Sequence, residues 1–364
     1  MGEMTEQEMM SNAFIEQICS SDGKGASIAF ELRGTQIHVS IFPSNDSSTK
    51  DSRHLQPEDR PLQDHLIDAL SRDSSGRPYG EHNVSQDEVL GAILKAGKPL
   101  FSQLTPKASS CEPLNLHQIL FAEILYFRLE GDSDPASVVP IEYEEAYNIG
   151  FFNWDTGQAF EEELDLCEDL PRYAPEDIVV KQVFMKGVKY VTAAVQVDGR
   201  DMFCKALGEP RQLRGCPEAR ELECLGKMLE AFPQQSSIRV PQLLGYVHDK
   251  DTKRILGFLR QWVPGQNLGD IYLAPIATET KQKWISQIRE SVQLLHEQGL
   301  VWGDAKPYNV VIDEKDDAWL IDFGGGFTAG WVDSQLVETI EGDEKALDRI
   351  AEFLSGNDDV VIYI

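Results

Sequence analysis

The stretch that decides the fold is "LVWGDAKPYNVVIDEKDDAWLIDFGGG", residues 300–326. It carries Asp304, Asn309 and Asp322 around two strand-like runs, so one hairpin can bring the three side chains together. Carboxylate and amide oxygens are the ligands that Mg²⁺ prefers. The stretch therefore indicates a site for a metal ion and a phosphate. The alternative is that Asp304 only begins a turn and Asp322 only caps the end of a strand.

The charge balance limits which partners the chain can have. Of its 364 residues, 61 are acidic and 33 are basic, which gives a formal net charge of −28. A chain with this charge is repelled by nucleic acid and by anionic lipid, so we expect neither as a partner. Any phosphate ligand must be held by local cations, a metal ion or backbone N–H groups.

The composition indicates a globular protein of a reducing compartment. Hydrophobic residues make up 41% of the chain, and the six cysteines form no C-x-x-C pair. The N-terminus "MGEMTEQEMM" lacks the apolar core of a signal peptide, and no stretch is apolar enough to cross a membrane. We expect a soluble, intracellular protein with no membrane partner.

From residue 178 onward the pattern is rich in strands. The runs "IVVKQVF", "KYVTAAVQV" and "DMFCKALG" read as three strands, and "PEARELECLGKMLEAF" reads as a helix. Two more strand-like runs follow, "QLLGYVHD" and "RILGFLRQWV". The next helix is predicted by apolar residues at helical spacing, namely Trp284, Ile288, Val292 and Leu295.

This order of elements resembles the protein-kinase-like fold, and the run "WGDAKPYNVVID" with "LIDFGGG" also looks like a group of uncharacterised fungal kinase-like proteins. "FCKA" falls where that family has its V-A-I-K strand, "GDAKPYN" matches the catalytic loop, and "DFG" is intact. The resemblance covers roughly residues 178–345. It implies an α+β, two-lobed domain at 178–354, with an N-lobe at 178–263 and a truncated C-lobe at 267–354.

The resemblance also implies cofactors and roles for residues of the C-lobe. Asp322 and Asn309 would bind Mg²⁺, and Asp304 would face the acceptor hydroxyl while ATP lies between the lobes. Lys306 matches a lysine placed near the γ-phosphate; the alternative is a surface lysine before Pro307.

In the N-lobe, Lys205 would contact the nucleotide phosphates, held by Glu221 of the following helix. Alternation along the strand turns Met202, Cys204 and Ala206 to one face and Phe203, Lys205 and Leu207 to the other, so Lys205 either reaches solvent at an edge or is paired. A solvated helix face is the alternative for Glu221. The backbones of Gln261 and Val263 would bind adenine, or else this segment is an edge strand that ends at Pro264.

Asp343 matches a helix aspartate that braces the catalytic loop, or it is an exposed acid near a helix start.

Gly187 is the one glycine where the family has three, so the backbone is expected to wrap phosphates less closely. Trp302 and Gly303 replace the His and Arg of H-R-D. No arginine is therefore expected beside Asp304, nor control by loop phosphorylation. The family's A-P-E motif does not follow "DFGGGFTAGWVD" in this sequence. The helices that dock peptide substrates in ordinary protein kinases are therefore not expected.

Residues 1–170 are expected to form an α/β extension with flexible loops. The patterns predict a helix near 11–19, a hairpin around Gly34, a loop at 43–61, helices at 61–72 and 86–103, and a helix or helix–strand element at 114–129. No phosphate loop, metal cluster or nucleophile–base pattern stands out. We expect this half to act as support or as a partner surface.

The sequence thus predicts an ATP-dependent phosphotransferase acting on a hydroxyl acceptor, with protein Ser/Thr preferred slightly over a small molecule. One alternative is a scaffold that binds nucleotide or a partner without turnover, as the poor glycine loop suggests. Another is a fragment of a longer kinase, because a final "VVIYI" fits an interrupted strand as well as a last one.

Overall fold

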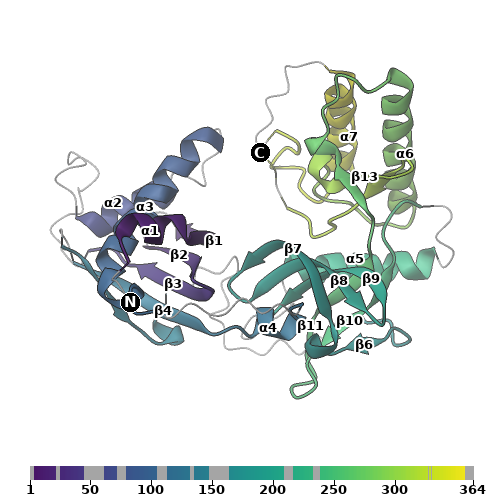
Figure 1. Ribbon diagram of the computed structural model, residues 1–364. Coiled ribbons are helices and arrows are strands. Elements are labelled where there is room, and N and C mark those ends of the chain that lie inside the picture. The colour runs from purple at the N-terminus through teal and green to yellow at the C-terminus, as the bar shows by residue number, and fades with distance from the viewer. Residues whose placement is uncertain are drawn as a thin grey trace.

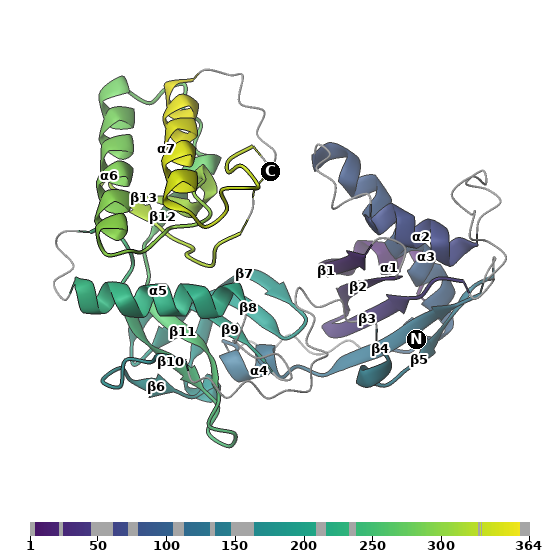
Figure 2. The ribbon, with the colours of Figure 1, turned by 180° about the vertical axis from the view of Figure 1, so that it is seen from behind.

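The structure is a computed structural model that describes residues 4–21, 25–44, 61–71, 79–104, 113–131, 135–146, 164–208, 216–232, 238–326, 328 and 330–356. In these residues the fold is mixed α+β, with seven α-helices and three sheets. The α+β class expected from the sequence is therefore confirmed. Figures 1 and 2 show the three sheets and the helices that accompany them.

The first sheet is formed within residues 13–140 and has the strand order β1-β2-β3-β4-β5. Strands β3 and β4 pair in parallel, and the other neighbouring strands pair antiparallel. Helices α1 (Glu6–Ser11), α2 (Leu62–Ser71) and α3 (Tyr79–Phe101) supply side chains to its apolar core. The strands are β1 (Ala13–Ser21), β2 (Gly25–Leu32), β3 (Thr35–Ile41), β4 (Ile124–Glu130) and β5 (Ser137–Pro140).

The helix expected near 11–19 is wrong, because this segment forms strand β1. The β1–β2 register shifts between Ile15 and Gln17, so Ile15 and Ile18 keep a three-residue spacing that imitates a helix in the sequence. The hairpin expected around Gly34 is confirmed. Arg33 and Gly34 both have positive φ, 55° and 76°, as a tight two-residue hairpin turn requires.

The second sheet has the strand order β6-β10-β11-β9-β8-β7. Helix α4 (Leu116–Leu120) shares one apolar core with its strands, and helix α5 (Pro217–Ala231) shares another. The expected helix–strand element at 114–129 is thus α4 followed by β4. The strands are β6 (Arg172–Tyr173), β7 (Val179–Gly187), β8 (Tyr190–Val197), β9 (Arg200–Leu207), β10 (Leu243–His248) and β11 (Ile255–Gln261).

The C-terminal part holds helices α6 (Thr278–Glu297) and α7 (Ile340–Ser355), which stand side by side in both views (Figures 1 and 2). The predicted apolar stripe of α6 is buried in the core it shares with α5 and α7. A small sheet lies beside these helices, built from β12 (Gly265–Asn267), β13 (Val310–Asp313) and β14 (Ala318–Leu320). In Figure 2, α5 lies between this group and the second sheet.

Some expectations fall outside the described residues, namely most of the loop at 43–61 and the final "VVIYI". No helix in the described ranges is both long and apolar enough to cross a membrane. Among the described residues no disulfide joins the five cysteines, which are Cys19, Cys167, Cys204, Cys216 and Cys224.

Candidate active site

Lys205 projects from the middle of β9, between strands β8 and β11. The expected alternation is confirmed: Met202, Cys204 and Ala206 are buried in the core that includes α4. Lys205 is itself buried, and its Nζ donates to Glu221 Oε2 at 2.6 Å. The sheet therefore directs this ammonium group toward α5, as the sequence predicted.

Glu221 is 1% exposed and is approached by two cations. Besides Lys205, Arg260 of β11 places its Nε 3.9 Å from Glu221 Oε1. Burial alone would lower the pKa of Lys205, but the carboxylates of Glu221 and Asp322 outweigh it and raise that pKa. Lys205 therefore stays charged across the physiological pH range.

Asp322 follows β14 and has a φ of 60°, a left-handed conformation that is uncommon for a residue with a side chain. Its Oδ1 accepts a hydrogen bond from Lys205 Nζ at 3.1 Å. Desolvation alone would raise the pKa of Asp322, but the charges of Lys205 and Lys306 outweigh it and lower that pKa. Lys205 thus joins the carboxylates of Glu221 and Asp322 into one group.

Asp304 is buried at the centre of a second group. Lys306 Nζ donates to its Oδ2 at 2.6 Å, and Thr328 Oγ1 donates to its Oδ1 at 2.9 Å. Asn309 Nδ2 donates to the Asp304 carbonyl at 2.8 Å, so the two ends of the segment 304–309 are held together. The two groups are adjacent, because Ile321 N–H donates to Asn309 O at 3.0 Å, one residue before Asp322.

Asp343, near the start of α7, braces the loop that leads to Asp304. The backbone N–H groups of Trp302 and Gly303 donate to its two carboxylate oxygens at 2.8 and 2.9 Å. His296 Nε2 of α6 lies 3.0 Å from the same carboxylate. Asp343 is buried rather than exposed, so the alternative of a solvated acid at a helix start is wrong.

Arg220 of α5 is a residue that the sequence analysis missed. Its guanidinium donates to three backbone carbonyls, those of Val301 (3.0 Å), Trp302 (3.3 Å) and Phe323. It thereby ties the segment before Asp304 to the segment after Asp322. No arginine precedes Asp304 in the chain, as the sequence analysis noted, but α5 brings the guanidinium of Arg220 against the backbone next to Gly303.

Two glycines make room for Arg220. A Cβ on Gly303, whose φ is 91°, would lie 2.7 Å from Arg220 Nη2, and a Cβ on Gly325 would lie 2.2 Å from Glu338 Oε1. Glu338 in turn places its Oε2 3.7 Å from Arg220 Nε. The glycine at position 303 is thus the one sequence feature that marks this space, and it does not say which residue fills it.

The residues expected to bind adenine lie at the end of β11 and just beyond it. Gln261 ends this strand and donates its N–H to Gln242 O at 2.9 Å, while Val263 is buried. The ring of Trp262 stacks on Phe184 at 5.4 Å between centroids, and Phe184 stacks on Phe203 at 6.1 Å. Aromatic rings therefore line this side of the candidate site.

Gly187 ends β7 at the tip of the β7–β8 hairpin. An ideal Cβ at this position would lie 3.0 Å from Gln17 Oε1 of the first sheet. A side chain at this position would therefore crowd Gln17 of β1, whatever the glycine does for a ligand.

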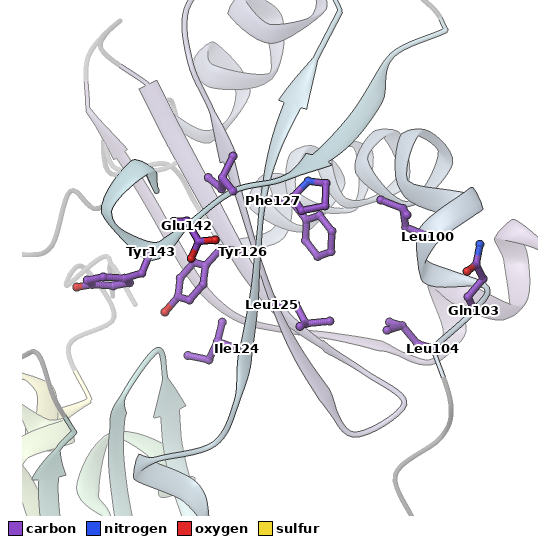
Figure 3. Close-up of a pocket in the computed structure, with 11 residues that line it drawn as sticks. Leu100, Gln103, Leu104, Ile124, Leu125, Tyr126, Phe127, Glu142 and Tyr143 are labelled. Atoms are coloured by element: carbon purple, nitrogen blue, oxygen red, sulfur yellow. The ribbon is translucent and has the colours of Figure 1, made fainter.

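An open pocket of about 630 Å³ lies in the N-terminal part of the chain, away from these residues. Figure 3 shows its mainly apolar lining, drawn from the end of α3, from β4 and from the segment after β5. Tyr126 and Tyr143 meet edge to face at its side, with centroids 5.4 Å apart. None of the predicted site residues lines this pocket.

Comparison with known proteins gives one distant similarity. No family model matches the chain. The chain is 29% identical over 145 residues to a cGMP-dependent protein kinase of Toxoplasma gondii. The match covers 36% of this chain and 14% of that protein, so the chain corresponds to a small part of its relative. The chain thus has a weak, partial similarity to a protein kinase.

Proposed function

We propose that this protein is an ATP-dependent phosphotransferase with a two-lobed, protein-kinase-like domain at residues 178–354, preceded by an extension at 1–170. It transfers the γ-phosphate of ATP to a hydroxyl acceptor, with protein Ser/Thr preferred slightly over a small molecule. The observation that carries the proposal is the contact set Glu221–Lys205–Asp322, next to Asp304 and Asn309. The distant similarity to a protein kinase supports it.

Lys205 supplies the local cation that a phosphate needs in a chain of net charge −28. Its ammonium is held by Glu221 on one side and lies 3.1 Å from Asp322 on the other. A buried, permanently charged lysine can exchange one carboxylate contact for a phosphate oxygen. Glu221 would then keep Lys205 in place while the nucleotide binds.

Asp322 and Asn309 fit a Mg²⁺ ion by the chemistry of their atoms. The lowered pKa keeps Asp322 a carboxylate at neutral pH, and Asn309 Nδ2 already donates to Asp304, so the amide oxygen is the atom a cation would use. The described residues contain no cluster of three or more His, Cys, Asp or Glu side chains suited to a metal. Water and phosphate oxygens would have to complete the shell. Bound there, Mg²⁺ would neutralise phosphate charge.

Asp304 would orient the acceptor hydroxyl and accept its hydrogen bond. Lys306 donates to one oxygen of this carboxylate and Thr328 to the other, and Lys306 also donates to Thr328, so the three side chains hold one another in place. Lys306 also lies close enough to lower the pKa of Asp322, so its charge acts on both groups. The peptide groups of Gln261 and Val263 would bind the base, beside the ring of Trp262.

A second candidate is a scaffold that binds nucleotide or a partner without turnover. It is favoured by the contacts of Asp304, because both carboxylate oxygens are bonded to Lys306 and Thr328. An acceptor hydroxyl must displace one of them before Asp304 can act on it. Turnover decides between the phosphotransferase and a scaffold that binds nucleotide, since both of these predict nucleotide binding.

The experiment is a thermal-shift titration of the full chain with ATP, with and without Mg²⁺, followed by a transfer assay. The assay offers a generic protein acceptor and a panel of hydroxylated metabolites. A site occupied a hundredfold above its dissociation constant adds roughly 2.7 kcal/mol of stability. Mg²⁺-dependent binding with transfer supports the phosphotransferase, and binding without transfer supports the scaffold. No binding at millimolar ATP contradicts both nucleotide-based proposals.

A further inference from the structure

The β7–β8 hairpin is held at its tip by the first sheet. Gln17 Oε1 of β1 accepts a hydrogen bond from Val188 N–H at 3.0 Å. Gln17 Nε2 contacts Cys19 Sγ at 3.3 Å, which orients the amide so that its oxygen faces the hairpin. Gly187 is what permits this approach, because a side chain there would meet Gln17. A strand of the N-terminal part therefore recognises the backbone of this hairpin directly.

A charged cluster reinforces the contact. Lys186 Nζ lies 2.7 Å from Glu16 Oε1 and 3.2 Å from Glu31 Oε2. Glu16 is only 9% exposed in its side chain, and Gln36 Nε2 donates to its other oxygen at 3.0 Å. Burial alone would lower the pKa of Lys186, but the two carboxylates outweigh it and raise that pKa. Lys186 is thus charged, partly desolvated and matched by acids that belong to the first sheet.

The same hairpin reaches the candidate active site within a few residues. Tyr190 pairs with Gly187 across the tip and with Leu207 of β9. Burial raises the pKa of Tyr190, and Lys205 and Asp322 are close enough to act on that pKa as well. The path from β1 to the site is therefore short: Gln17 to Val188, then Tyr190, then Lys205.

We infer that Glu16 and Gln17 are positioning residues for the nucleotide site, so that the first sheet sets how the β7–β8 hairpin covers a bound nucleotide. The inference rests on the proposed function. A hairpin with three glycines can adjust its own backbone to phosphates, whereas this one has Gly187 alone and takes its position from β1. The N-terminal extension then contributes to binding without touching the ligand.

The test uses charge reversal in the full chain. Glu16→Lys and Lys186→Glu each break the buried pair, and the double variant restores opposite charges in exchanged positions. Gln17→Met removes the acceptor of Val188 N–H at similar volume. Glu6→Lys is the matched control, because Glu6 is exposed on α1 and lies away from the hairpin. A thermal melt of each variant checks that it is folded.

Two readouts are taken. Amide hydrogen exchange over residues 186–190 reports the contact without any nucleotide, and titration with Mg·ATP reports its consequence. Each disruptive variant should speed exchange at the tip and weaken Mg·ATP binding by roughly 2- to 30-fold. The double charge reversal should recover part of both, because Glu31 still faces position 186, and Glu6→Lys should change neither.

Failure of the inference and failure of the proposed function are distinguishable. If the unaltered protein binds Mg·ATP and the variants bind it equally well despite faster exchange, the positioning role is wrong while the proposed function stands. If tip exchange does not change in any disruptive variant, the contact itself is not made in solution and the inference is overturned. If the unaltered protein does not bind Mg·ATP, the proposed function fails and the inference fails with it.

Discussion

The guanidinium of Arg220 fills the space that a side chain on Gly303 would need: an ideal Cβ there would lie 2.7 Å from Nη2. The same guanidinium donates to the carbonyls of Val301 and Phe323, which belong to the two loops that carry Asp304 and Asp322. The space beside Gly303 is thus filled by an arginine that comes from helix α5. Several consequences of this arrangement can be measured.

Gly303→Ala should destabilise the protein by more than backbone strain accounts for. Gly299→Ala is the matched control, because Gly299 has a similar positive φ of 71° and no atom within 4 Å of the added Cβ. The control should lose about 1–2 kcal/mol from strain alone. Gly303→Ala should lose about 1–3 kcal/mol more, because Arg220 must move. Urea denaturation measures both, and equal losses would show that Arg220 does not occupy this space.

Lys205→Met should lower stability as well as abolish Mg·ATP binding. Removing the ammonium leaves Glu221 buried with Arg260 as its remaining cation, and breaking a buried pair in this way costs about 3–5 kcal/mol. The double variant Lys205→Met/Glu221→Leu should stay destabilised and should not bind Mg·ATP, because it leaves the buried Arg260 without its carboxylate and the site without its ammonium. Recovery of nucleotide binding in the double variant would contradict the role of Lys205 as a phosphate cation.

Thr328→Val should reduce turnover with little effect on the Michaelis constant for ATP. Its hydroxyl donates to Asp304 Oδ1 and accepts from Lys306, so its loss frees the carboxylate to rotate. One hydrogen bond to a charged group is worth about 1.5–3 kcal/mol, so we expect a loss of about tenfold or more in kcat. Thr328→Ser, which keeps the hydroxyl, should retain activity. Equal losses of kcat in Thr328→Val and Thr328→Ser would show that packing at residue 328, rather than its hydroxyl, matters.

Asp317 should stabilise the β13–β14 hairpin at neutral pH but not in acid. Hydrogen bonds from Lys283 and Gln287, at 2.9 and 2.6 Å, lower the pKa of Asp317 below its ordinary value of about 3.9. A carboxyl whose folded-state pKa is depressed contributes stability above its unfolded pKa, and that contribution is lost as pH falls through the folded value.

The comparison is between the unaltered protein and Asp317→Asn, by urea denaturation from pH 7 down to pH 3. The difference in unfolding free energy should be largest at pH 7 and should shrink below about pH 4. A difference that stays constant with pH would mean that the Asp317 charge contributes nothing to stability.

What the sequence could predict was decided by local pattern. Alternation along β9 correctly separated Lys205 from Cys204, and the hairpin turn followed from the residues around Gly34. The helix expected near 11–19 was wrong because a bulge in β1 shifts the alternation to a helical spacing. Patterns of this kind reveal periodicity, but they do not reveal a change of register within one strand.

The rest could not be predicted because it depends on contacts between distant residues. Arg220 lies about 80 to 100 positions from the carbonyls it binds, and on its helix it is simply the neighbour of Glu221. Glu16 meets Lys186 across a still larger separation, and an acid in a polar strand gives no local signal of a partner. These contacts form only when elements that are far apart in the sequence pack together in the fold.

The most direct test of the account is the separation of binding from chemistry at Asp304 and Asp322. The variants Asp304→Ala and Asp322→Ala are each titrated with ATP in the presence and in the absence of Mg²⁺. Transfer assays are then run on both variants. Asp304→Ala should lose most turnover and keep nearly unchanged ATP binding, because Asp304 orients the acceptor. Asp322→Ala should lose Mg²⁺-dependent binding and turnover together, because it would hold the cation. Equal loss of ATP binding in both variants would contradict the assignment.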